Sequence, residues 1–280
     1  MPCQPDRPVP ADAAAEGAYA YAELGSGPAS GSAVLAEEVA LAIAYNGLSQ
    51  AVMMASPGDL EDFVRGFSLS AGLVESIDDI YDIRLKRLAD AVSVDVQITN
   101  RAFWALKRLR RRLAGTSGCG LCGVEALEQA LPELRPLEPA PLPPAAHLQG
   151  LRQRIDQAQS LAQRSGALHA ALYVDGTGSI VLCREDIGRH NALDKLIGAL
   201  KQQRLDCREG FAVVTSRCSL ELIQKAVRAG IATLVSLSAP SALTVEWARG
   251  HRLNLVHLPH HNAPRVYSPA PASHRHPTSR

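Results

Sequence analysis

The alternation of apolar and polar residues predicts strands and helices along most of the chain. In the first half, the segments VALAIAY and LSQAVMMA flank Asn46-Gly47, a pair typical of tight hairpin turns. Two more strand patterns, IYDIRLKRL and AVSVDVQIT, precede a helix with apolar residues at 103, 106, 109 and 113. Ser56-Pro57 predicts the start of another helix, with Ser56 as its cap.

The second half begins with two strand patterns and then alternates between helix and strand patterns. ALYV and SIVLC are expected to pair around a DGTG turn. The strands FAVVT, ATLVSLS and LNLVHL are separated by the helical segments LELIQKAVRAG and ALTVEWARG, and HNALDKLIGAL precedes them. Such alternation, with nearly continuous apolar strands, predicts an α/β fold with a largely parallel sheet covered on both faces.

Shifts in composition predict the division of the chain. The segment LPELRPLEPAPLPPAAHL is dense in proline and indicates a semi-rigid connection. We therefore expect, in order, a disordered tail (1–30), an N-terminal α+β subdomain (31–135), a proline-rich linker (136–150), a C-terminal α/β domain (151–268) and a second disordered tail (269–280).

Composition and charge narrow the class of protein. Hydrophobic residues make up 46% of the 280 residues and the net charge is +1, so no global basic field points to nucleic acid. No secretory signal and no uncharged apolar run of membrane-spanning length is visible. Six scattered cysteines fit a cytoplasmic protein with reduced thiols better than a disulfide scaffold.

Polar or small residues follow four of the predicted strands. Because ligands of open α/β sheets bind at the carboxyl ends of strands, where helix N-termini attract anions, we expect a phosphate-bearing ligand there. A capped amphipathic helix is the alternative explanation for the charged run around residues 184–195. The candidate binding residues at the first three strand ends are Glu185, Asp186, Arg189, His190, Asn191, Ser216, Arg217 and Ser238.

The stretch TSGCGLCGVEAL sets Cys119 and Cys122 three residues apart among glycines. A thiolate is the reactive form of cysteine, and glycine-flanked N–H groups, a helix start and the upstream KRLRRR run would all favour it. A structural zinc site is an alternative that needs two further ligands, for which His257, His260 and His261 are the nearest in kind. A thioredoxin-like pair would instead follow the first strand of a βαβ unit.

Taken together, these motifs resemble the formate dehydrogenase accessory sulfurtransferases, the FdhD family. The resemblance runs from about Glu37 to Tyr267 and rests on EEVALAIAYNG, SPGDLEDFVRGFSLSAGLV, RRRLAGTSGCGLCG, REDIGRHNALDKLIG, VVTSRCSLELIQKAVRAGI and SAPSALTVE. It implies a sandwich fold similar to that of cytidine deaminases, without the H-x-E and P-C-x-x-C zinc site of those enzymes.

The resemblance also implies a task. Such a protein takes sulfur as a persulfide from a cysteine desulfurase and passes it to the molybdenum cofactor, in its bis(molybdopterin guanine dinucleotide) form, for formate dehydrogenase. Cys119 would carry the persulfide and Cys122 would assist, no resident metal is expected, and the protein would be a homodimer. By register, the family's cofactor-binding segment falls here on Leu258, Pro259, His260, His261, Asn262 and Ala263, where its arginines and glycines are replaced.

Two other functions stay open at this point. The chain could be a non-enzymatic chaperone that binds the cofactor and a client enzyme while its cysteines are structural. It could also be a guanine-nucleotide-binding module that uses the strand-end residues alone.

Overall fold

The computed structural model describes residues 18–24, 30–89, 91–115 and 131–271. Its N-terminal half contains β1 (Ala18–Ala22), β2 (Ser30–Val34), β3 (Val39–Tyr45), β4 (Leu48–Ala55), α1 (Leu60–Ser70), the 3₁₀ turn η1 (Ile77–Asp79), β5 (Ile80–Arg87), β6 (Ala91–Ile98) and α2 (Asn100–Gly115). Among the described residues, no helix is long and apolar enough to cross a membrane.

The C-terminal half begins with the 3₁₀ turn η2 (Ala145–Leu148). It continues with α4 (Leu151–Ala158), α5 (Ser160–Ser165), β7 (His169–Val174), β8 (Ile180–Asp186), α6 (Arg189–Gln202), β9 (Phe211–Val214), α7 (Leu220–Ala229), β10 (Thr233–Ser236), α8 (Ala242–Gly250), β11 (Asn254–His257) and β12 (Arg265–Ser268).

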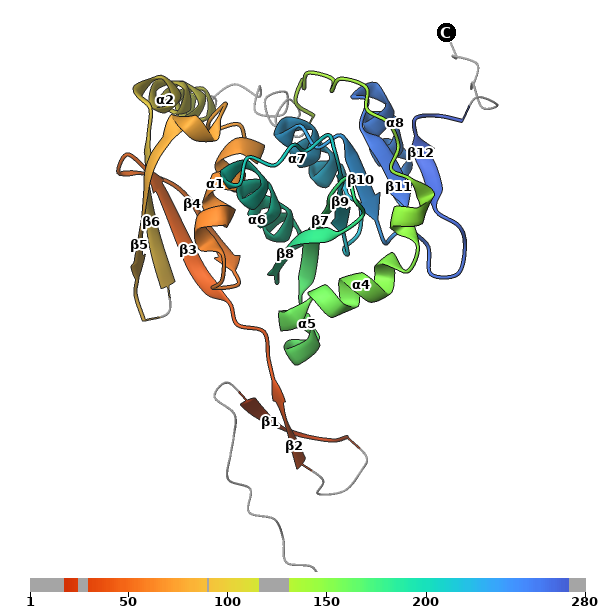
Figure 1. Cartoon of the computed structure of the whole chain (residues 1–280). Helices are drawn as coiled ribbons and strands as arrows, with labels where there is room; N and C mark the ends of the chain where they lie inside the picture. Colours follow the sequence, from red (N-terminus) through yellow and green to blue (C-terminus); the bar gives the residue numbers. More distant parts are fainter. Residues whose placement is uncertain (1–17, 25–29, 90, 116–130, 272–280) are drawn as a thin grey trace, which may run out of the picture.

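The described strands form one small hairpin and two larger sheets. β1 and β2 form the hairpin, which projects from the body of the molecule (Figure 1). The four-stranded sheet has the order β4-β3-β6-β5, and the six-stranded sheet has the order β12-β11-β10-β9-β7-β8. In the six-stranded sheet only the pairs β9–β10 and β10–β11 are parallel.

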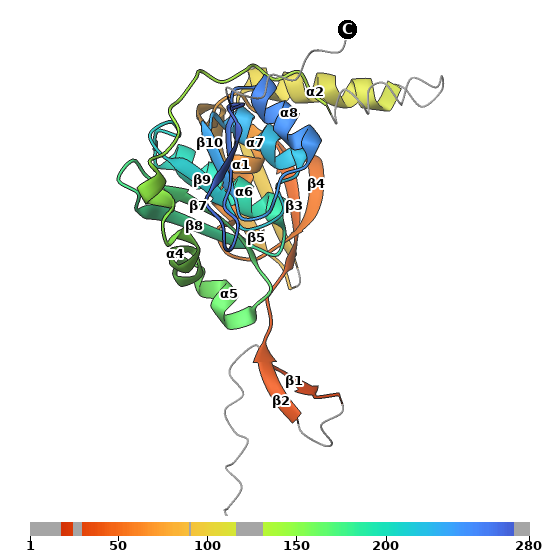
Figure 2. The same cartoon turned by 90° about the vertical axis from the view of Figure 1, so that its right-hand side faces the viewer.

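A layer of helices lies between the two larger sheets (Figures 1 and 2). Alternate residues of β3 and β6 point into this layer, because side chains of a strand alternate between its faces: Leu41, Ile43 and Tyr45 are buried, as are the valines of β6. α1, α6 and α7 contribute to the same continuous core. A second, smaller core under η2 and α4 covers the other face of the six-stranded sheet.

The contact between α1 and α6 depends on two glycines. A Cβ atom added to Gly66 would lie 1.8 Å from the carbonyl oxygen of Asp194, and one added to Gly198 would lie 1.8 Å from that of Asp62. The two helix backbones therefore touch directly, which any larger residue would prevent. Since α1 and α6 belong to different halves of the chain, this contact joins the halves into one core.

The proline-rich segment is tied to the six-stranded sheet along its length. The Leu137 N–H donates to the carbonyl of His251 at 3.0 Å, and the Asn254 amide donates to the carbonyls of Ala140 and Pro141. These bonds supply partners for a stretch that proline keeps from forming regular structure. The segment 136–150 is thus held against the C-terminal half by hydrogen bonds.

Several expectations from the sequence are confirmed. β3 and β4 pair through Asn46 and Gly47, which both have positive φ values of 47° and 77°, as a tight hairpin turn requires. β7 and β8 pair around the DGTG turn, and the helices and strands expected from residue 189 to residue 257 are all present. Both faces of the six-stranded sheet are covered.

Three expectations differ from the structure. The sheet is mixed, because β7 and β8 form a hairpin and β7 then pairs antiparallel with β9. α1 begins at Leu60, and Ser56 does not cap it: the Ser56 hydroxyl instead accepts from the Ile187 N–H at 3.1 Å. Residues 18–22, expected to belong to an unstructured tail, form β1. The expected helix after the cysteine pair lies outside the described residues.

The close helix contact predicts that Gly198→Ala destabilises the protein severely. The added methyl group would overlap the Asp62 carbonyl, and overpacking of a core typically lowers the free energy of unfolding by about 1–3 kcal/mol. Urea unfolding followed by circular dichroism measures the change. Gly250→Ala in α8 is the matched control, since no atom lies within 4 Å of a Cβ placed there. Equal stability of the two variants would contradict the assigned contact.

Candidate functional site

The ends of β8, β9, β10 and β11 lie along one edge of the six-stranded sheet. β8 and β9 both run antiparallel to β7, so they point the same way, and β10 and β11 run parallel to β9. The start of β7, at His169, falls between the ends of β8 and β9. The structure therefore brings together, at what we call the strand-end edge, the segments that the sequence predicted to meet.

Two arginines at this edge have no acceptor among the described residues. Arg189 is the first residue of α6 and its half-buried side chain has a buried Nε atom without a partner. Arg217 follows β9 and is exposed. The hydroxyl of Ser219 is also buried without a partner. We call these three residues, with His169, the arginine cluster.

The N-termini of two helices add to the positive potential of this cluster. α6 begins at Arg189, directly after Gly188, and α7 begins after Ser219, whose side chain makes no capping bond. The first N–H groups of a helix lack acceptors within the helix, and its dipole favours negative charge there. Two guanidinium groups beside two such termini form a suitable place for a phosphate group.

The positive charge of this cluster affects the pKa of His169. Burial holds the pKa of His169 below its ordinary value, and the positive charges of Arg189 and Arg217 lower it further, while Asp186 opposes them. The imidazole is therefore mainly neutral at pH 7. An anion bound between the two arginines would reverse part of this effect, because it would favour the protonated ring.

The predicted residues Glu185, Asp186 and Asn191 bond within the protein. Glu185 accepts from the N–H groups of Leu161 and Ala162 and so caps α5. The fully buried Asp186 pairs with the fully buried Lys195 at 2.8 Å and also accepts from the Ser56 and Gly188 N–H groups. The Asn191 amide donates to Asp186 and to the Met54 carbonyl. These bonds fix the edge and connect β8 with the end of β4.

The remaining predicted residues at the ends of β9 and β10 lie beside the arginine cluster. Ser216 is buried and its hydroxyl donates to the Arg217 carbonyl at 3.3 Å. The Ser238 N–H donates to the Ser236 hydroxyl, which in turn donates to the Ser238 carbonyl at 2.8 Å. Both serines thus bond locally within the turns that follow their strands.

The predicted segment 258–263 connects β11 to β12 at the same edge. Leu258 is buried, whereas His260, His261, Asn262 and Ala263 are exposed and Pro259 is half-buried. Arg152 of α4 donates to the carbonyls of Leu237 and Leu258, and its Nη1 lies 3.3 Å from Nε2 of His260. Arg152 therefore holds the ends of β10 and β11 in place beneath this segment.

His257 lies at the root of the segment. It is 7% exposed, and its Nδ1 atom is buried without a partner among the described residues. Burial lowers its pKa, and Arg265 and Arg152 lower it further. The segment thus carries the exposed His260 and His261, and Arg152 and Arg265 lie close enough to its first residues to act on His257.

His190 lies in a different place from the other residues of its run. Its imidazole contacts the Glu221 carboxylate of α7 in a cavity of about 310 Å³ at the end of α1. His190 therefore lines this cavity, and it also lies near enough to Arg189 and His169 for their charges to lower its pKa.

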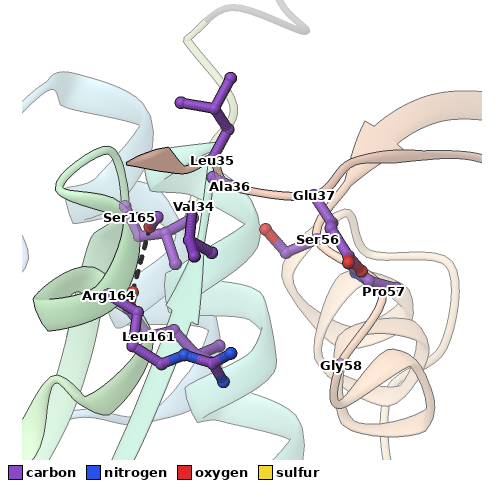
Figure 3. Close-up of a pocket in the computed structure, with 11 residues that line it drawn as sticks. Val34, Leu35, Ala36, Glu37, Ser56, Pro57, Gly58, Leu161, Arg164 and Ser165 are labelled. Atoms are coloured by element: carbon purple, nitrogen blue, oxygen red, sulfur yellow. Dashed lines mark hydrogen bonds between the residues drawn. The ribbon is translucent and has the colours of Figure 1, made fainter. Parts of the chain in front are cut away.

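A further cavity, of about 240 Å³, lies between the β2–β3 connection, the start of α1, and α5 (Figure 3). Val34 and Leu161 line one side of it and Ser56 and Pro57 line the other, and its charged groups are Glu37 and Arg164. One cation opposed by one carboxylate makes it less suited to a phosphate than the arginine cluster.

Cys119 and Cys122 lie outside the described residues. The described cysteines are Cys183, Cys207 and Cys218, and all three are free thiols. Burial raises the pKa of each of them, to about 12 for Cys183 and Cys218. None of the three is therefore a thiolate at neutral pH. In the part of the chain that the structure describes, no three His, Cys, Asp or Glu side chains gather as a metal site.

Sequence reasoning missed three residues of the edge. His169 begins a strand whose pairing with β9 was not predicted, Arg152 reaches the edge from α4, and Ser219 precedes α7. Only Ser219 carried a signal, since serine before an apolar helix indicates an N-cap. The positions of His169 and Arg152 follow from the pairing order of the strands and from packing across the sheet.

Comparison with known proteins agrees with this fold. The chain is 43% identical to the curated sulfur carrier protein FdhD of Bordetella petrii over 86% of this chain and 87% of that relative. It is also 43% identical to the protein of the same name from Cupriavidus necator, over 84% of this chain and 81% of the relative.

A solved structure shows the same architecture. It is a crystal structure of a protein assigned provisionally as a formate dehydrogenase accessory protein, from Desulfotalea psychrophila. It matches with a TM-score of 0.69 at 21% identity, over 89% of this chain and 95% of that chain. The model of the FdhD/NarQ family matches residues 36–273, which include every element from β3 to β12. The chain therefore belongs to the FdhD/NarQ family.

Proposed function

We propose that this protein is a cytoplasmic sulfur carrier that acts in the maturation of formate dehydrogenase. It accepts sulfur from a cysteine desulfurase as a persulfide on Cys119, with Cys122 as the assisting thiol. It then delivers that sulfur to its substrate, the molybdenum cofactor in its bis(molybdopterin guanine dinucleotide) form. The names of the curated relatives support the carrier role, and the provisional assignment of the solved structure supports the link to formate dehydrogenase.

One observation carries the cofactor part of the proposal. Arg189 and Arg217 lie at the strand-end edge without acceptors among the described residues, beside the N-termini of α6 and α7. The charges of both guanidinium groups act on His169, and a bound anion would offset this positive charge. A guanine dinucleotide carries phosphates that suit this place. The second half of the substrate would lie along the segment 258–263, held by Arg152.

The described cysteines support the assignment of the chemistry to the CxxC pair. A sulfur acceptor must be ionised to attack a persulfide, and Cys183, Cys207 and Cys218 are all buried or half-buried thiols with raised pKa values. For any of these three cysteines to transfer sulfur, the packing around its side chain would have to open. Cys119 and Cys122, with their glycine-rich neighbours, remain the candidates.

Replacement of the carrier cysteine tests the transfer role. Cys119→Ala should abolish the gain of one sulfur atom when the protein is incubated with a cysteine desulfurase and cysteine, as measured by intact-protein mass spectrometry. Cys183→Ala is the matched control and should load sulfur like the wild type, because its thiol has a pKa of about 12. An unchanged sulfur load in Cys119→Ala would reject the carrier role of this residue.

The binding of GDP tests the strand-end edge. Arg189→Gln and Arg217→Gln should each weaken the binding of GDP at least about tenfold in calorimetry, because each removes a charge-assisted bond. Arg208→Gln, which changes an exposed arginine outside the cluster, is the control.

The affinity for GDP should also depend on pH. It should rise as the pH falls from 8 to 6, because His169 gains a proton when the anion binds, and this dependence should flatten in His169→Gln.

Two outcomes would redirect the proposal. If the arginine variants and the control bind GDP equally well, the cofactor does not bind at the strand-end edge. Tight GDP binding by a protein that never gains sulfur would favour the non-enzymatic chaperone.

A further inference from the structure

The hairpin of β1 and β2, which we call the arm, is covered by neither hydrophobic core. It projects from the body of the molecule, and none of its described residues belongs to either core (Figures 1 and 2). The side chains of Tyr19, Tyr21 and Leu24 are 63%, 48% and 105% exposed. Large apolar side chains that gather on one exposed element are typical of a contact surface.

The arm has little to stabilise it alone. Its strands have five residues each and pair at all five positions. The ring of Tyr21 rests on Gly31, where an added Cβ atom would lie 2.7 Å from the ring, so this side chain is held in place. A two-stranded hairpin without further packing is only marginally stable in water. We therefore expect another surface to cover the arm.

The cavity of about 240 Å³ beside α5, which we call the recess, lies at the root of the arm. Its walls are mainly apolar and include Val34 of β2 and Leu161 of α5, which lie side by side, together with Leu168 (Figure 3). The recess is large enough for an aromatic ring and offers the apolar walls against which such a ring packs.

The tyrosines of the arm cannot fill the recess of their own molecule. Ala18 pairs with Val34, and Tyr19 pairs with Ala33. Paired residues lie on the same face of a hairpin, and successive residues lie on opposite faces. Val34 faces the recess, so Tyr19 and Tyr21 lie on the face of the arm that points away from it. One molecule thus carries two separate surfaces of matching chemistry.

We propose that two copies of this chain exchange arms, so that the tyrosine face of each arm covers the recess of the other copy. A two-fold pair suits such surfaces, because each copy supplies one arm and one recess and neither is left over. The arm precedes residues 36–273, the part of the chain that the family model matches. The inference goes beyond the proposed function, since this association needs no sulfur transfer.

The charges of the two surfaces are compatible. Glu23 is the single charged residue among the described residues of the arm. Arg164 lines the recess, and no described residue accepts a hydrogen bond from it. Glu37, the other charged group of the recess, lies on the opposite side, beside Pro57 (Figure 3). The carboxylate of the arm and the guanidinium of the recess would therefore attract each other across the interface.

The size of the contact predicts a weak pair. A fully covered aromatic side chain buries about 150–250 Å². Tyr19 and Tyr21 are about half exposed, so four such rings and the surfaces that they cover would remove on the order of 1,000 Å² from water. This area is at the lower limit for specific interfaces. We therefore expect a dimer that dissociates on dilution into the micromolar range.

Sedimentation velocity of the full chain across the micromolar range tests the exchange. The wild type should change from monomer to dimer as its concentration rises. The arm variant, Tyr19→Ser with Tyr21→Ser, should associate at least about tenfold more weakly, because buried aromatic anchors carry most of the binding energy of such interfaces. Tyr81→Ser on β5 is the matched control: its side chain is 72% exposed outside the arm and the recess, so its association should equal that of the wild type.

The recess variant, Leu161→Lys, changes the other surface and leaves the arm intact. The Leu161 side chain is 41% exposed, so this variant should fold, which circular dichroism verifies. A charge in the apolar recess should also weaken association at least about tenfold. A mixture of the arm variant and the recess variant should associate more strongly than either variant alone, because a mixed pair keeps one intact arm in one intact recess.

A wild type that stays monomeric throughout this range would overturn the inference. A dimer that keeps its affinity in both variants would do the same, since it would use another surface, and so would a mixture that regains no affinity. Sulfur loading of Cys119 does not enter these measurements, so their outcome is independent of the test of the proposed function.

Discussion

The fold depends on the direct contact of two helix backbones. α1 belongs to the N-terminal half and α6 to the C-terminal half, and Gly66 and Gly198 let them approach until backbone atoms touch. The short separation brings polar groups of both helices within bonding distance. Ser70 of α1 meets Asp194 of α6 at 2.5 Å, and Arg184 of β8 reaches Asp62 of α1 at 2.8 Å. A wider separation would leave these buried groups without partners, which is costly.

This contact also fixes the position of the first turn of α6. The first turn of α6 carries Arg189 and His190 side by side in sequence, but they serve different places: Arg189 joins the strand-end edge, and His190 faces the end of α1 and α7. The Asp186–Lys195 pair anchors the turn before α6 to the segment after β4. The start of α6 is therefore held firmly, and this fixes the position of Arg189 at the strand-end edge relative to the sheet.

Much of this arrangement could be predicted from the sequence. Asn46-Gly47 identified its hairpin because both residues must adopt positive φ, and apolar periodicity identified the strands and helices from β7 to β11. The meeting of the strand ends followed from topology. The order in which the strands pair could not be predicted, because a strand that pairs in a hairpin and a strand that pairs after a parallel crossover have similar runs of apolar residues. Nor could the sequence show that Glu185, Asp186 and Asn191 bond internally, since a charged run before a helix looks the same whether its partners are a ligand or the protein.

The burial of the described cysteines affects the rate at which sulfur can be transferred to them. Sulfane sulfur moves readily between exposed thiols, so a protein that holds it transiently loses its cargo to any competing acceptor. Cys207 and Cys218 are 4% exposed, and Cys183 lies half-buried within β8. Their neutral, shielded sulfur atoms make poor nucleophiles, and stray migration to these positions is slow. In the proposed sulfur carrier, the packing of these side chains would therefore limit the loss of sulfur to the wrong cysteine.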